Sequence, residues 1–165
     1  IFKDYPQNSH RRARMQTLRS TLSERFGAAG NSAPAYIWRG QSGSRRLLEN
    51  EADIAAALAA RGFNIIDPAT HTAAEICAAL NGSPLVVGVE GSQLVHGLLN
   101  LRPGGALLCI QPASRFNAVY RGFTNTLDLN WGFIVADGTA DSFRLPIDRL
   151  LATIELTLEH INQPC

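Results

Sequence analysis

Residues 85–96 read Leu85-Val86-Val87-Gly88-Val89-Glu90-Gly91-Ser92-Gln93-Leu94-Val95-His96, an apolar run that ends abruptly in an acid and two small residues. The run predicts a buried strand, and the amphipathic segment that follows predicts a helix after a tight turn. In an open parallel sheet, such a turn lies at the carboxyl edge, where α/β proteins bind phosphorylated ligands. This stretch therefore predicts an α/β fold with a candidate anion site at its turn.

The same alternation of short apolar runs and amphipathic segments continues along the chain. We expect strands at residues 36–39, 63–67, 85–89, 106–111 and 132–136, and helices at residues 9–26, 51–61, 73–80, 92–101, 115–127 and 147–161. Five strands, each followed by a helix, predict a Rossmann-like, doubly wound parallel sheet of about five strands.

Local signals support the expected helix ends. Gly27, Gly62 and Gly82 stand where three helices should stop. Asn50 and Thr72 precede two helices as candidate N-caps, Glu75 completes a capping-box spacing with Thr72, and Pro146 stands at the start of the last helix.

The length of 165 residues, with 45% hydrophobic residues, suits one sizeable core. We expect an N-terminal helix and linker over residues 1–34 and a Rossmann-like domain over residues 35–165. The chain opens at Ile1 without a leader pattern, so we interpret it as a piece of a longer protein. No apolar run approaches the length of a membrane span. We expect a cytoplasmic, soluble piece, with any membrane association supplied by sequence outside this chain.

Basic residues are concentrated in the first third of the chain. Residues 1–46 hold nine Lys and Arg against two acids. A solvated helix face is the favoured interpretation for residues 11–25, ahead of binding to nucleic acid or lipid phosphates. Cys77, Cys109 and Cys165 are too scattered for a zinc site, and we expect Cys77 and Cys109 to be buried thiols in a reducing compartment.

Polar residues follow each expected strand, at the edge where ligands bind. The guanidinium of Arg39, with Arg45 and Arg46 nearby, suits bidentate donation to a diphosphate, and a surface salt bridge to Glu51 or Glu90 is an equal alternative. The other residues at strand ends are Asp67, Glu90, Gln111 and Asp137.

The turn after the central strand carries three further candidates. Gly91 permits close backbone approach to a ligand, and Ser92 either caps the helix or donates its hydroxyl. Glu90 suits a sugar hydroxyl, or else it only favours the helix dipole. For His96, a core or surface role is favoured over catalysis.

Several nucleotide and hydrolase motifs are absent from the sequence. It has no Gly-x-Gly-x-x-Gly fingerprint, no Walker loop and no Gly-x-Ser-x-Gly elbow. These absences weaken the dehydrogenase, phosphate-loop NTPase and serine-hydrolase interpretations.

The chain nevertheless resembles the glycosyltransferase family 61 domain over about residues 36–112. The pattern includes Arg39, Arg45, Arg46, Asn50, Glu51, Gly62, Phe63, Asp67, Pro68, Val87, Gly88, Glu90, Gly91, Ser92, Leu94, Pro103, Gly104, Gln111 and Pro112. It departs from the family where Glu90-Gly91-Ser92 replaces the commonest His-Gly-Ala and where His96 replaces Asn. With one lysine beside fourteen arginines, the composition looks like that of a GC-rich bacterium.

The resemblance implies the C-terminal, nucleotide-sugar-binding half of a GT-B fold, with the N-terminal acceptor half missing. A bacterial, polysaccharide-building, inverting transferase with no obligatory metal and no cofactor is implied, acting on a glycan or polysaccharide hydroxyl. The implied donor-binding residues are Arg39, Arg45, Asn50, Gly91, Ser92 and Gln111. The general base is Glu90 or His96, or lies in the absent half.

Two other functions remain open. The fold could serve a non-catalytic domain that binds a partner or glycan, with Glu90 marking a lost phosphate site. An unrelated sugar-phosphate enzyme, such as an epimerase, is the third interpretation.

Overall fold

The computed structural model describes residues 9–27, 33–40 and 45–163. In chain order its elements are α1 (Ser9–Phe26), β1 (Ala35–Ile37), β2 (Leu47–Leu48), α2 (Glu51–Ala59), β3 (Asn64–Ile66), α3 (Ala73–Leu80), β4 (Ser83–Val89), α4 (Leu94–Asn100), β5 (Leu101–Pro112), the 3₁₀ helix η1 (Ala113–Arg115), α5 (Val119–Thr126), β6 (Asn130–Gly138), β7 (Ser142–Arg144) and α6 (Ile147–Asn162).

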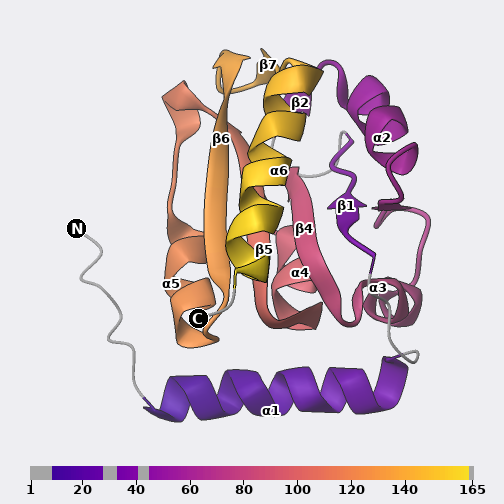
Figure 1. The fold of residues 1–165 in the computed structure, drawn as a ribbon, viewed down its shortest axis with the longest axis vertical. Helices are drawn as coiled ribbons and strands as arrows, with labels where there is room; N and C mark the ends of the chain where they lie inside the picture. Colours follow the sequence, from indigo (N-terminus) through magenta and orange to yellow (C-terminus); the bar gives the residue numbers. More distant parts are fainter. Residues whose placement is uncertain (1–8, 28–32, 41–44, 164–165) are drawn as a thin grey trace.

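The strands form one sheet in the order β2-β7-β6-β5-β4-β1-β3. Strands β3, β1, β4, β5 and β6 are parallel, so their carboxyl ends share one edge, which is uppermost in Figure 1. From β1 the chain adds β3 on one side, and then it adds β4, β5 and β6 on the other. The order therefore reverses between β1 and β4, which makes this position the topological switch point of a doubly wound sheet.

Helices cover both faces of the sheet and α1 crosses its amino edge (Figure 1). Helices α2 and α6 cover one face, and α3, α4 and α5 cover the other. Strand β4 alternates between the two cores, since Leu85, Val87 and Val89 belong to the first and Val86 to the second. Burial on both faces explains why this strand is a continuous apolar run.

The predicted Rossmann-like α/β sheet is confirmed, with two short strands added. Strands β2 and β7 have two and three residues, too few to show a hydrophobic period, and β7 runs antiparallel to β6. The helix predicted over residues 115–127 is wrong at its start, because α5 begins at Val119. There the side-chain oxygen of Asn117 accepts the Val119 N–H, and the backbone N–H of Asn117 donates to the Gln111 side chain. These local hydrogen bonds replace a first helical turn.

Most of the predicted helix ends are confirmed. Gly62 and Gly82 adopt φ of 80° and 82°, which favours glycine. Thr72 and Glu75 form the predicted capping box. Asn50 is the N-cap residue of α2, as predicted, but its side chain makes no capping hydrogen bond. It donates to the Leu145 carbonyl at 2.8 Å and accepts the Leu145 N–H at 3.2 Å.

Helix α1 is attached to the rest of the domain through its arginines, so the predicted solvated face is wrong for at least three of them. Arg11 lies over the Phe123 ring at 4.7 Å from its centroid, Arg12 pairs with Asp128, and Arg19 donates to carbonyls at the C-terminal end of α4. The domain division at residues 34 and 35 stays a prediction.

The two cysteines within the described ranges are buried free thiols, as predicted, and Cys165 lies outside those ranges. Among the helices described, none combines the length and the hydropathy needed to cross a membrane.

Candidate functional site

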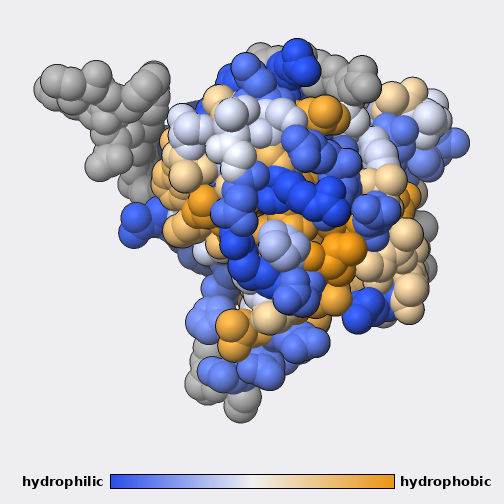
Figure 2. Space-filling model, turned by 90° about the horizontal axis from the view of Figure 1, so that it is seen from above, coloured by the Kyte–Doolittle hydropathy of each residue, from blue (hydrophilic) through white to orange (hydrophobic). Residues whose placement is uncertain are grey.

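The candidate site lies at the switch point, where the ends of β1 and β4 stand side by side. Ile37 pairs with Gly88 in the sheet, so Arg39 and Glu90 each follow their strand by about the same distance. A crevice outside such a reversal is where open α/β sheets bind ligands. Figure 2 looks onto this edge and shows a band of hydrophilic side chains crossing it, with hydrophobic ones beside the band.

A buried carboxylate fixes the backbone that carries Arg39. Glu51, at the start of α2, is 4% exposed and accepts the N–H groups of Arg39 at 2.7 Å and Gly40 at 2.9 Å. It also accepts the hydroxyl of Tyr36 at 2.9 Å. Burial, followed by the charge of Glu51, raises the pKa of Tyr36 well above its usual value, so this hydroxyl keeps its proton and donates.

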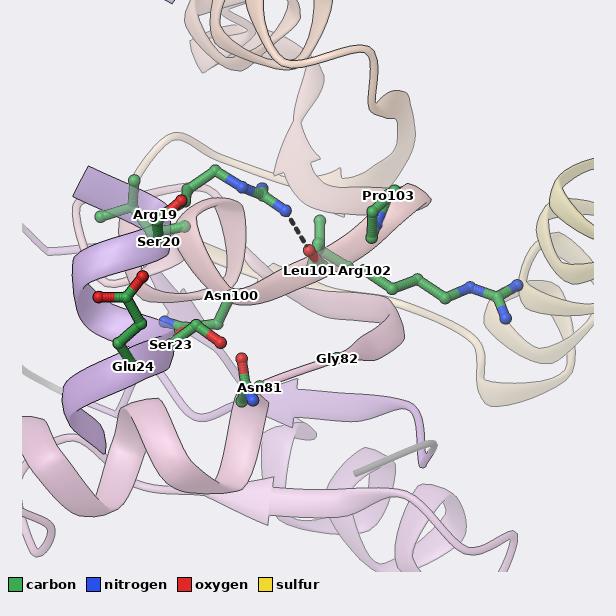
Figure 3. A pocket seen from close by; sticks show the side chains of 11 residues that line it. Arg19, Ser20, Ser23, Glu24, Asn81, Gly82, Asn100, Leu101, Arg102 and Pro103 are labelled. Carbon is green, nitrogen blue, oxygen red and sulfur yellow. Dashed lines mark hydrogen bonds between the residues drawn. The ribbon is translucent and has the colours of Figure 1, made fainter. Parts of the chain in front are cut away.

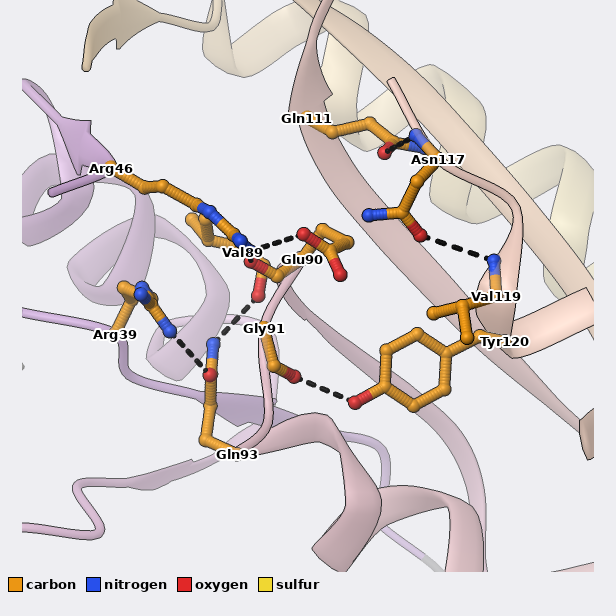
Figure 4. A network of polar contacts seen from close by, with 10 residues as sticks. All are labelled: Arg39, Arg46, Val89, Glu90, Gly91, Gln93, Gln111, Asn117, Val119 and Tyr120. Atoms are coloured by element: carbon orange, nitrogen blue, oxygen red, sulfur yellow. Dashed lines mark hydrogen bonds and ion pairs between the residues drawn. The ribbon is translucent and has the colours of Figure 1, made fainter. Parts of the chain in front are cut away.

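The guanidinium of Arg39 lies against the turn after β4 (Figure 4). Its Nη1 donates to Gln93 Oε1 at 2.8 Å, and Gln93 Nε2 donates to the Val89 carbonyl at 2.6 Å. A Cβ at Gly91 would stand 2.2 Å from Arg39 Nη1. A side chain at this position would displace the ends of the Arg39 and Gln93 side chains, so Gly91 leaves room for the arginine to pack on the turn.

Arg46 reaches the same turn from the segment before β2. Its Nη1 forms an ion pair with the Glu90 carboxylate and donates to the Glu90 carbonyl at 2.5 Å. Both side chains are largely buried, with Glu90 7% exposed. This pairing compensates the charge of a carboxylate that would otherwise repel an anion.

Arg39 and Arg46, both from the connection between β1 and β2, converge here, and Arg115 from the connection between β5 and α5 is near enough for its charge to act on Arg39. Burial lowers the pKa of Arg39 from its ordinary value, and the nearby charges of Arg46 and Arg115 lower it further, whereas Glu90 and Glu51 act in the opposite direction. Arg39 still remains a cation at physiological pH, as arginine does in proteins. The cluster contains more arginines than carboxylates, which suits an anionic ligand.

Two polar side chains complete the site on the β5 side. The buried Tyr120 hydroxyl donates to the Gly91 carbonyl at 2.7 Å, and burial raises its pKa, so it remains protonated. Gln111 accepts the Asn117 N–H at 3.0 Å through Oε1. Both contacts brace the rim around Glu90.

The structure brings Arg39, Glu90, Gly91 and Gln111 to one rim, as the sequence predicts for strand ends. The alternative prediction is a salt bridge from Arg39 to Glu51 or Glu90. In the structure, Glu51 accepts the backbone N–H of Arg39, and the carboxylate of Glu90 pairs with Arg46. Arg45 is exposed.

Three other candidates contribute less than predicted to this rim. The Asn50 amide is occupied by Leu145. Ser92 is exposed in the turn and does not cap α4, which begins at Leu94 with Gln93 as its N-cap residue. His96 lies half-buried on α4, and burial lowers its pKa. Among the residues described, the N–H groups of Gly91, Ser92 and Gln93 donate to no protein acceptor.

The sequence did not single out Gln93, Arg115, Asn117 or Tyr120, and it gave Arg46 less weight than Arg45. Arg115 carries a detectable signal, because it follows the strand-end pair Gln111-Pro112 by three residues. Tyr120 carries none, since its hydroxyl reaches Gly91 only through the packing of α5 on the sheet.

A pocket of about 480 Å³ lies at the opposite edge, between α1 and the turns that precede β4 and β5 (Figure 3). Arg19 lines it and is already bonded to the carbonyls of Leu98 and Leu101. Because the pocket lies at the amino edge of the sheet, it is remote from the switch-point site at the carboxyl edge. In the parts of the chain described, no three His, Cys, Asp or Glu residues gather as they would around a metal ion.

Comparison with known proteins identifies a family and gives structures of similar fold. The family model described as Glycosyltransferase 61 matches residues 1–108, which takes in α1 ahead of the residues that carried the resemblance. No curated protein matches the chain. The chain is similar to the crystal structure of 2R,3R-butanediol dehydrogenase from Bacillus subtilis at 15% identity and a TM-score of 0.38, covering 92% of this chain and 47% of that one. This chain thus spans about half the length of the dehydrogenase.

Proposed function

Because the chain belongs to the glycosyltransferase 61 family, we propose that its switch-point site binds the nucleotide-sugar donor of a glycosyl transfer. The observation that carries the proposal is the convergence of Arg39 and Arg46 on the turn after β4, with the charge of Arg115 acting on Arg39. A diphosphate is the part of such a donor that needs several fixed cations.

In the proposed reaction, the oxygen of an acceptor hydroxyl attacks the anomeric carbon from the face opposite the leaving group. The bond between that carbon and the phosphate oxygen breaks, and its electron pair leaves with the nucleoside diphosphate. Negative charge then grows on the phosphate, where Arg39, Arg46 and the N–H groups of Gly91 and Ser92 stabilise it. The transfer inverts the anomeric configuration.

The proton of the acceptor hydroxyl requires a base. We propose Glu90, because its carboxylate stands within the arginine cluster. His96 is the second candidate, since its lowered pKa leaves an imidazole that is neutral and able to accept a proton. A base from a further domain of the whole protein would replace both.

The remaining donor-binding candidates have lesser proposed roles. Arg45 is placed to meet the outer part of the donor because it is exposed next to Arg46. Asn50 acts indirectly, by tying the start of α2 to Leu145. The acceptor is proposed to be a glycan or polysaccharide.

A non-catalytic binding domain is the alternative, and the Arg46–Glu90 pair favours it. The pair already compensates one of the three arginines, so an anion must compete with a carboxylate that the protein supplies. A domain that had lost donor binding would leave this pair undisturbed.

The test is calorimetric titration of the chain with UDP, GDP, CDP and their sugars, using Arg39→Ala, Glu90→Gln and the control Arg61→Ala. Arg61 is exposed, and its guanidinium donates only to the Ala57 carbonyl of its own helix. Loss of a charge-assisted contact of about 1.5–3 kcal/mol predicts an affinity lowered about tenfold to 150-fold in Arg39→Ala.

The three variants separate the two functions. Unchanged affinity in Arg61→Ala, together with the loss in Arg39→Ala, supports a donor site. Glu90→Gln is expected to tighten diphosphate binding, because it removes a competing carboxylate. Absence of binding by the folded chain to every nucleotide contradicts the donor-site proposal and favours the binding domain.

A further inference from the structure

An exposed aromatic cluster lies beside the candidate site. Phe116 and Phe133 meet edge to face, with centroids 4.9 Å apart and planes at 75°, and each is 45% exposed. Trp131 lies 5.2 Å from Phe133. A cluster of aromatic rings exposed to solvent indicates a binding surface.

Sheet register joins this cluster to the polar rim. Cys109 pairs with Phe133, and Gln111 pairs with Val135. Side chains two residues apart on a strand share a face, so Phe133 and Gln111 are diagonal neighbours on the face covered by α5. Phe116 precedes Asn117, whose N–H donates to Gln111.

Gln111 supplies an observation that is independent of the rings. Its side chain is 1% exposed, and its Nε2 finds no hydrogen-bond acceptor among the residues that the structure describes. Buried amide donors in folded proteins almost always have an acceptor. An orphaned donor at the rim of a site therefore indicates an acceptor that belongs to a ligand.

We propose that Phe116, Phe133 and Gln111 form a subsite for the nucleobase of the donor. The inference rests on the proposed function, because the nucleobase belongs to the same donor whose diphosphate binds the arginines. The base stacks on the aromatic pair, and Gln111 Nε2 donates to a carbonyl oxygen on its edge. Uracil, cytosine and guanine carry such an oxygen, whereas adenine offers only ring nitrogens as acceptors, so the proposed carbonyl contact favours the first three bases.

The dimensions of the sheet fit this assignment. Three strand spacings separate β1, which positions Arg39, from β6, which carries Phe133, or about 14 Å. A ligand extended along the carboxyl edge thus meets cations at the switch point and aromatic rings at its far end. A diphosphate joined to a nucleoside has this distribution of charged and flat parts.

The test compares three ligands on the same chain by calorimetry: UDP, ADP and inorganic pyrophosphate, which has no base. The wild-type chain is expected to bind UDP more tightly than ADP or pyrophosphate. Phe116→Ala should weaken UDP about fivefold to 150-fold, the range of a lost base-stacking contact, and leave pyrophosphate unchanged. Gln111→Leu should bring UDP and ADP to similar affinities.

Phe26→Ala is the matched control, since Phe26 is an exposed phenylalanine at the end of α1 on the amino edge. Circular dichroism verifies that each variant is folded. If Phe116→Ala does not fold, Phe133→Ala is used in its place. Pyrophosphate binding with UDP affinity insensitive to both rings overturns the base subsite and leaves the donor site standing. Failure of all three ligands to bind overturns the proposed function, and the base subsite with it.

Discussion

Removing the buried carboxylate of Glu51 tests whether one side chain fixes the backbone beneath Arg39. In Glu51→Ala, two deeply buried donors, the Tyr36 hydroxyl and the Arg39 N–H, lose their acceptor. At about 1–3 kcal/mol for each unsatisfied donor, the free energy of unfolding should fall by about 2–6 kcal/mol. The Gly40 N–H is only partly buried and can turn to water, so it is left out of this sum.

The assay is urea unfolding followed by far-ultraviolet circular dichroism. Glu49→Ala is the control, because Glu49 is exposed and accepts one hydrogen bond from Ser142, so its change should stay within about 0.5 kcal/mol. Adding Tyr36→Phe to Glu51→Ala removes the orphaned hydroxyl and should restore about 1–3 kcal/mol. A double variant no more stable than Glu51→Ala would refute the reasoning, as would a Glu51→Ala protein as stable as the control.

Four further outcomes follow from the contacts and burial of single residues. Gly91→Ala should lower UDP affinity at least about tenfold while the chain stays folded. The added Cβ would stand 2.2 Å from Arg39 Nη1 and so displace the guanidinium from its charge-assisted contact with the diphosphate. Unchanged affinity in calorimetry would contradict this. Arg19→Ala should destabilise the chain by about 1.5–3 kcal/mol in urea, because the carbonyls of Leu98 and Leu101 lose their donor. Arg14→Ala, at an exposed position, should change stability by less than about 0.5 kcal/mol. Burial raises the pKa of Cys109 to about 12, so iodoacetamide at pH 8.5 should modify this thiol only in unfolded protein, as read by peptide mass spectrometry. Because the unfolded chain releases that proton first, the contribution of Cys109 to stability should fall as pH rises from about 8.5 towards 12, and Cys109→Ala should remove this dependence.

The parallel sheet was predictable because its strands are buried on both faces. Such strands are continuous apolar runs, and residues 85–89 are the clearest example. Strands β2 and β7 could not be predicted, because their pairing is set by contacts between distant parts of the chain rather than by any local period. The start of α5 was missed for a related reason, since the Gln111 side chain competes for the Asn117 N–H.

The candidate site was predictable in position but less so in composition. The rule that ligands lie beyond the carboxyl ends of parallel strands located Arg39, Glu90 and Gly91. It could not show that Arg46 rather than Arg45 turns inward, because adjacent residues on a loop share the same sequence context. Nor could it assign Asn50 to Leu145, a partner 95 residues away.

The pairing of β2 with β7 has a consequence for the order in which the protein is assembled during synthesis. Leu47 donates to the Asp141 carbonyl and Glu49 to the Phe143 carbonyl, and Asn50 bonds to Leu145. Arg46 is the residue next to this pairing, so the segment that carries it has no native backbone partner until residues 141–145 have left the ribosome. The amino-terminal strands can associate earlier, since domains acquire structure as the chain emerges. The arginine cluster is therefore completed only after β7 has been synthesised, and a chain that terminates before residue 141 would be unable to hold Arg46 in place.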